Sequence, residues 1–157
     1  ALVGFMWILF GTLLLSTHFL IDKKALQRKS TSADAKDGLI IGLFQALALF
    51  PGISRSGSTI IGSMFRKFSR ENAFTLSFLL SIPAVLGATV LKLKDGNLDG
   101  LGLGTGTISI VVAGVVGFFS LKLLQKILKS DKFYLFGIYC LTLGFIVLLV
   151  NWSNLGI

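Results

Sequence analysis

The amino-acid sequence predicts an all-α integral membrane protein with four transmembrane helices and one re-entrant helix-loop-helix. Hydrophobic residues make up 54% of the chain, and the mean hydropathy is +0.85. These values exclude an ordinary soluble domain. Four apolar runs approach the length of about 20 residues that crosses a bilayer as a helix. A further apolar region, residues 38–65, is interrupted by a polar turn that contains an arginine.

The four predicted spans cover residues 1–21, 73–93, 107–124 and 133–152. The first has no basic segment before it, which favours a span over a signal peptide. Ser77 and Ser81 are expected to satisfy backbone groups freed by Pro83 in the second span. The glycine-rich stretch at 94–106 is expected to be a loop, because no strand and amphipathic helix flank it as in a nucleotide-binding motif. The small residues expected to allow close helix packing are Gly38, Gly42, Ala46, Ala113 and Gly117.

The polar turn, residues 52–59, is the candidate functional site. An arginine within a hydrophobic segment costs about 2.5 to 3.5 kcal/mol by insertion scales, so Arg55 is expected to have a function. Four hydroxyl residues surround it, and two glycines allow a close approach of the backbone to a ligand. The hydroxyl residues are Ser54, Ser56, Ser58 and Thr59, and the glycines are Gly52 and Gly57.

The two arms of this region give the turn its backbone donors. Pro51 is expected to end the first arm. If Ser58 or Thr59 begins the second arm, the free N–H groups and the positive dipole end of that helix point at the turn. Guanidinium, hydroxyl and amide donors together predict a phosphate site. The alternative is an ordinary Pro-Gly turn whose arginine extends to the membrane surface.

The distribution of basic residues predicts that the 38–65 region re-enters the membrane. Loops 22–37, 66–70 and 122–132 carry 12 of the 15 Lys and Arg residues. A re-entrant hairpin places all 12 on one face, whereas a full crossing leaves seven on each face. The positive-inside rule favours the hairpin, with the basic loops cytoplasmic. A first arm of 13 residues reaches about 20 Å, past the midplane of a core of about 30 Å, so the turn opens toward the outer leaflet.

Other residue types exclude several functions. The net charge of +8 lies in short clusters without interleaved aromatic residues, which argues against nucleic-acid binding. Cys140 has no partner in the sequence for an internal disulfide. The single histidine, His18, is expected to be interfacial. No carboxylate lies inside a predicted span, so the sequence offers no metal ligand at the turn.

Two motifs carry a resemblance to a known family. The segment from Gly42 to Thr59 and the segment from Ser69 to Pro83 resemble the undecaprenyl-diphosphatase, or bacitracin-resistance, family. The resemblance implies a multi-pass enzyme of the bacterial inner membrane. It implies hydrolysis of undecaprenyl diphosphate to undecaprenyl phosphate, which regenerates the lipid carrier for cell-wall synthesis. It also implies two inverted repeats and dependence on magnesium or calcium.

By motif position, the resemblance implies catalytic roles for Arg55, Ser54 and Thr59. Gly52, Ser56, Gly57 and Ser58 are implied to bind the substrate, as is Gln45, for which a helix-packing hydrogen bond is the alternative. The family's other signature, with paired glutamates and a histidine, is absent. The chain is therefore expected to be the C-terminal half of a longer protein, inactive by itself. A half-length protein that forms a homodimer, and a transporter or flippase that binds polyprenyl phosphate without cleavage, are the alternatives.

Overall fold

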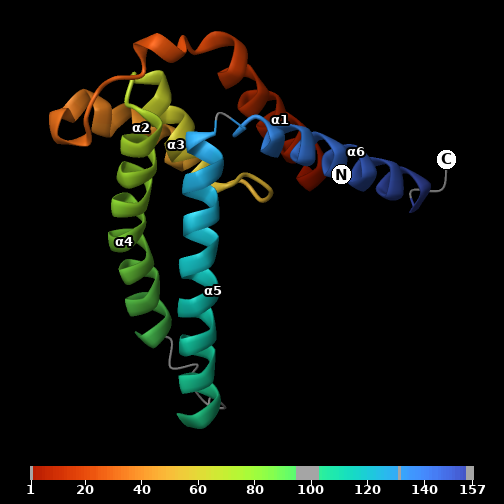
Figure 1. Cartoon of the computed structure of the whole chain (residues 1–157). Coiled ribbons are helices and arrows are strands. Elements are labelled where there is room, and N and C mark those ends of the chain that lie inside the picture. The colour runs from red at the N-terminus through yellow and green to blue at the C-terminus, as the bar shows by residue number, and fades with distance from the viewer. Residues whose placement is uncertain (1, 95–102, 131, 155–157) are drawn as a thin grey trace.

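The computed structural model describes residues 2–94, 103–130 and 132–154, which form helices and no β-strand (Figure 1). The all-α prediction is therefore confirmed for this part of the chain. The α-helices are α1 (Leu2–Leu20), α2 (Ala35–Leu47), α3 (Arg55–Phe65), α4 (Arg70–Lys94), α5 (Leu103–Lys129) and α6 (Leu135–Asn154). Two short 3₁₀ helices, Lys23–Ala25 and Ser30–Ser32, lie between α1 and α2.

Each predicted span overlaps one helix. Three helical segments are long and apolar enough to cross a membrane, namely Leu2–Leu20, Arg70–Lys92 and Gly104–Lys129. A shorter apolar segment, Leu135–Asn151, lies in α6. The chain is thus a helical, multi-pass membrane protein. Of the predicted glycine-rich loop, residues 95–102 lie outside the described residues. The rest of that prediction was wrong in part, because α5 already begins at Leu103.

Helices α1 and α6 pack side by side and antiparallel (Figure 1). Glycines on each helix let the two backbones touch. A Cβ built on Gly144 would lie 2.8 Å from the carbonyl oxygen of Gly4, and one built on Gly11 would lie 2.8 Å from that of Gly137. The glycines that the sequence analysis named are not used in contacts among the described helices. At Gly38, Gly42 and Gly117 an added Cβ would meet nothing within 4 Å.

Helices α2 and α3 form an antiparallel hairpin. A capping box starts α2, in which the side chains of Asp34 and Asp37 each accept a hydrogen bond from the other residue's backbone N–H. The helix ends at Leu47, before the predicted stop at Pro51. Helix α3 begins at Arg55, one turn before Ser58 and Thr59, the starts that the sequence analysis considered. The start of α2 and the end of α3 lie together at the base of the hairpin.

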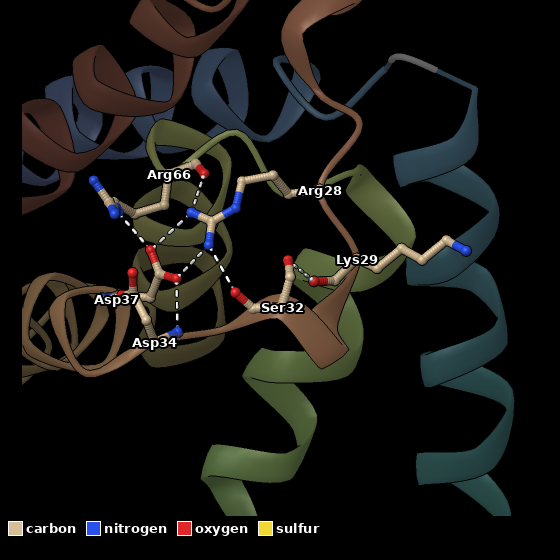
Figure 2. Close-up of polar contacts among 6 residues, drawn as sticks. All are labelled: Arg28, Lys29, Ser32, Asp34, Asp37 and Arg66. Atoms are coloured by element: carbon tan, nitrogen blue, oxygen red, sulfur yellow. Dashed lines mark hydrogen bonds and ion pairs between the residues drawn. The ribbon is translucent and has the colours of Figure 1, made fainter.

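Asp37 joins the two ends of this hairpin (Figure 2). Its carboxylate is fully buried and accepts two hydrogen bonds from Arg28, at 3.0 and 2.7 Å. It also accepts one from Nε of Arg66, which directly follows α3. The Arg28 guanidinium lies over the ring of Phe68, 4.5 Å from its centroid. The loop before α2 is therefore tied to the segment after α3 by charged groups at one end of the molecule.

Helices α4 and α5 lie side by side and antiparallel, away from the α1–α6 pair (Figure 1). Ser69 caps the N-terminus of α4, since the backbone N–H of Asn72 donates to the Ser69 hydroxyl at 3.3 Å. An ion pair of 2.5 Å between Glu71 and Lys129 joins the start of α4 to the end of α5. Only 6% of the apolar span of α4, and none of that of α5, is buried. These two helices therefore leave most of their apolar surface for other partners.

Candidate functional site

The turn between α2 and α3 packs against α1. Gly52 has a φ of +102°, a region that glycine adopts without strain. A Cβ at this position would lie 2.7 Å from the Trp7 ring and 3.2 Å from the carbonyl oxygen of Val3. At Gly57, a Cβ would lie 2.6 Å from the ring of Phe10. At both glycines the missing side chain makes room for α1, which fixes the turn beside the first half of that helix.

The N-terminus of α3 supplies backbone donors at the turn. Ser54 is the N-cap, and its hydroxyl accepts a hydrogen bond of 3.2 Å from the N–H of Gly57. The N–H groups of Arg55 and Ser56, in the first turn, have no carbonyl within the helix to bond. The positive end of the helix dipole lies at the same place. An anion at this turn would therefore be stabilised.

A cavity of about 240 Å³ lies beside this N-terminus. Six polar residues line it: Gln45 from α2, Arg55, Ser56 and Thr59 from α3, and Ser77 and Ser81 from α4. The one hydrogen bond of the Arg55 guanidinium to a described residue is a long one, 3.4 Å, to the Ser81 carbonyl. Its other N–H groups are thus available to a ligand. A guanidinium pairs with carboxylates and phosphates in a bidentate fashion.

The predicted hydroxyl residues do not all lie beside Arg55. Thr59 lines the cavity, and its hydroxyl lies 2.6 Å from that of Ser77. Ser56 also lines the cavity, whereas Ser54 caps α3, with its hydroxyl 3.4 Å from that of Ser56. Ser58 is fully buried and donates to the Ser54 carbonyl at 2.9 Å. The structure thus brings together Arg55, Ser56, Thr59 and Gln45, and places Ser58 away from them.

Ser77 and Ser81 are cavity residues that the sequence analysis did not identify. Their expected role beside Pro83 was wrong. The Ser77 hydroxyl contacts Thr59 and donates to the Ser56 carbonyl at 3.3 Å, and the Ser81 hydroxyl donates to the Phe78 carbonyl at 2.6 Å. Residues four apart share one face of a helix. Two serines four residues apart, on the helix that follows the Arg55 motif, were the feature of the sequence that could have predicted this role.

The polar groups of the cavity do not by themselves suit a divalent cation. Among the described residues, no group of three or more His, Cys, Asp and Glu side chains could hold a metal ion. Magnesium and calcium prefer carboxylate and carbonyl oxygens, whereas the cavity offers a guanidinium, hydroxyls and one amide. The arrangement can bind and orient a phosphate and offset part of its negative charge.

Comparison with known proteins gives one consistent result. The family model for "Bacitracin resistance protein BacA" matches residues 1–146. An undecaprenyl-diphosphatase of Alkaliphilus metalliredigens is 49% identical over 120 residues, which cover 73% of this chain and 43% of that protein. One from Methanothermobacter thermautotrophicus is 39% identical over 150 residues, covering 93% and 81%. One from Thermosipho melanesiensis is 42% identical over 133 residues, covering 84% and 52%. No solved structure matches the chain.

The helices and the cavity define a class of protein, a multi-pass helical membrane protein with a polar, arginine-lined cavity beside a helix N-terminus. The chain belongs to the bacitracin resistance protein BacA family, because the family model covers nearly all of it. The chain spans about half of the length of several curated relatives that it matches, and most of the length of the Methanothermobacter protein.

Proposed function

We propose that this chain supplies the phosphate-binding part of an enzyme that hydrolyses undecaprenyl diphosphate to undecaprenyl phosphate and phosphate. The observation that carries the proposal is the Arg55 guanidinium, which lines a cavity of hydroxyl groups with most of its donors available. The names of the relatives, undecaprenyl-diphosphatase, agree with this chemistry. They favour hydrolysis over the alternative of a transporter or flippase.

Phosphoryl transfer depends mostly on positioning and on electrostatic stabilisation. Arg55 would hold the diphosphate through its planar fork and stabilise the charge that develops on the transferred phosphoryl group. Ser56 would donate a hydrogen bond to a phosphate oxygen, and Gln45 would contribute its amide. The Thr59 hydroxyl is buried and donates to the carbonyls of Arg55 and Ser56, so it would hold the first turn of α3 in place beside the phosphate. Ser54 stabilises the N-terminus of α3, where backbone N–H groups face the anion. Ser77 acts through Thr59, whose hydroxyl it contacts.

Any magnesium or calcium ion would be held by carboxylates outside this chain, since the cavity lacks them. We propose that this chain is the C-terminal half of the enzyme and that the N-terminal half supplies the general acid–base groups. A second copy of the chain in a homodimer is the alternative source of the missing groups.

We further propose that the α2–α3 hairpin enters and leaves the bacterial inner membrane on the cytoplasmic side. Two observations support this. The charged groups around Asp37 hold both ends of the hairpin at one base. At the other end, Gly52 contacts Trp7, near the start of a helix of 19 residues and about 28 Å. The hairpin therefore reaches past the membrane midplane, and the cavity opens toward the outer leaflet.

The test is phosphate release from undecaprenyl diphosphate by the full-length protein. Arg55→Lys should lower kcat/KM by about a hundredfold or more, because a point charge does not replace the bidentate fork. The unfolding temperature should change little, since Arg55 makes one long hydrogen bond. The 157-residue chain alone should release no phosphate.

Arg66→Lys is the matched control. This variant also replaces an arginine by a lysine, but at the base of the hairpin, where Arg66 donates to Asp37. It should therefore lower the unfolding temperature and leave the kcat/KM of the folded protein unchanged. Wild-type phosphate release by Arg55→Lys would contradict the proposed role. Retained lipid binding without any phosphate release by the wild-type protein would favour the transporter alternative.

A further inference from the structure

A second cavity, larger and mostly apolar, lies next to the polar one. Its volume is about 440 Å³, within the range of about 300 to 1,000 Å³ for small-molecule sites. Side chains of α1, α3, α5 and α6 line it, among them Phe10, Ile60, Ile127 and Phe136. Four residues with hydroxyl groups are also among its lining residues, namely Ser54, Ser56, Ser120 and Tyr139. A ligand for this cavity must therefore be largely hydrocarbon.

Ser56 lines both cavities. The reason is its position on α3, where successive residues are about 100° apart around the helix axis. Arg55 and Thr59 lie on one side of Ser56 and line the polar cavity, whereas Gly57 and Ile60 lie on the other side and line the apolar one. The two cavities thus share one residue, Ser56, at the N-terminus of the helix.

The apolar cavity is continued along α5 and α6. A neighbouring hollow of about 310 Å³ shares Ile127, Phe136 and Tyr139 with it and reaches Lys132. The residues that line the two cavities are mostly apolar. Together they offer a hydrocarbon chain a surface along α5 and α6.

We propose that this apolar cavity binds the isoprene units of the lipid substrate nearest to the diphosphate, with Ser56 at the junction of headgroup and hydrocarbon chain. The proposal rests on the proposed function, since it takes the diphosphate to lie beside Arg55. A lipid diphosphate has a strongly anionic end joined directly to a hydrocarbon. The polar cavity and the apolar cavity share Ser56, so they provide these two environments next to each other.

Cys140, the chain's single cysteine, lines this cavity and reports on its occupancy. In the full-length protein in detergent, modification by a membrane-permeant maleimide is followed by mass spectrometry of the peptide that contains Cys140. Undecaprenyl phosphate or diphosphate should slow the reaction by about tenfold or more. Inorganic diphosphate at saturation, which has no hydrocarbon chain, should leave the rate unchanged.

Other occupants of the cavity give different results, and each of them would overturn the proposal. Equal slowing by inorganic diphosphate would mean that the headgroup alone protects the thiol. Protection in every condition would mean that another polypeptide segment or a membrane lipid fills the cavity. No slowing by undecaprenyl phosphate or diphosphate would place the hydrocarbon chain elsewhere.

A variant that fills the cavity provides an independent measurement. Ser120→Phe places a ring in the apolar cavity from α5, and Ser109→Phe is the matched control, an exposed position on the same helix. Ser120→Phe should raise KM for undecaprenyl diphosphate by about tenfold. It should leave the inhibition constant of inorganic diphosphate against this substrate unchanged, because inorganic diphosphate has no hydrocarbon chain. An equal weakening of both, or no change in either, would overturn the proposal. If the wild-type protein does not hydrolyse undecaprenyl diphosphate, the proposed function fails, and the Cys140 measurement still tests the binding cavity.

Discussion

Asp37 is a buried carboxylate whose charge holds the base of the hairpin together (Figure 2). Removing one partner of a buried ion pair destabilises a protein because the remaining charges lose their compensation. Asp37→Asn should lower the free energy of unfolding by about 3 kcal/mol, at the low end of the usual range, since Arg28 and Arg66 stay partly exposed. Unfolding in detergent measures this. Asp34→Asn is the control and should change little, because asparagine also caps a helix.

The same residue predicts a pH dependence. Burial alone would raise the pKa of Asp37, but hydrogen bonds from Arg28, the Asp34 N–H and Arg66 hold that pKa well below its usual range. An unfolded carboxyl has a pKa of about 3.9. The stabilisation is therefore complete above about pH 5 and is lost as the pH falls toward the lower pKa of the folded state. The difference in stability between wild type and Asp37→Asn should shrink below about pH 4; a constant difference down to pH 3 would contradict this.

Residues of the site could be predicted where one motif contains them. Arg55, Ser56 and Thr59 lie in a single turn, and hydroxyls around an intramembrane arginine are visible in the sequence. Ser77 could not be assigned in the same way, because its contact with Thr59 depends on how α4 packs on α3. Ser58 was also predicted to bind the substrate. Its position on α3, three residues after Arg55, instead turns its side chain into the protein, where it is buried.

Between elements, the contact of α1 with α6 depends on paired glycines. At Gly144 an added Cβ would lie 2.8 Å from the carbonyl oxygen of Gly4 and 2.7 Å from the side chain of Ile8. Backbone cannot move as easily as a side-chain end, so Gly144→Ala should lower the free energy of unfolding by about 1 to 3 kcal/mol. Thermal or denaturant unfolding measures the change.

Gly114→Ala on α5 is the matched control, because an added Cβ there meets nothing within 4 Å. Alanine has the better helix propensity by about 1 kcal/mol, so this variant should be as stable as the wild type or slightly more stable. If both variants behaved alike, the α1–α6 contact would not carry the packing that we assign to it.

The helices themselves were predictable from hydropathy, but their contacts were not. Helix α1 is apolar on all sides, and so its sequence does not show which face meets α6. Gly38, Gly42 and Gly117 were chosen as contact residues because small residues lie four apart along a single helix. The observed contacts need glycines on two helices at the same height, at positions 4 and 144 and at positions 11 and 137.

Over the whole molecule, the basic residues predict its orientation in the membrane. Lys67 follows α3, Thr31 lies in the loop before α2, and Lys126 lies near the end of α5. The ion pairs at Asp37 and at Glu71 bring the segments around these three positions to the same end of the fold. Lys92, near the other end of α4, lies away from them. If the hairpin is re-entrant, the first three positions share one side of the membrane and Lys92 faces the other.

Single cysteines test this arrangement. In a full-length Cys140→Ser background freed of other cysteines, Lys92→Cys should react with an impermeant maleimide added to intact spheroplasts. Thr31→Cys, Lys67→Cys and Lys126→Cys should react only after the membrane is permeabilised, because the positive-inside rule places them in the cytoplasm. Labelling of Lys67→Cys from outside, with Thr31→Cys protected, would show that residues 38–65 cross the bilayer. Arg55 would then lie in a segment that crosses the whole membrane, and the cavity beside it would not belong to a re-entrant hairpin.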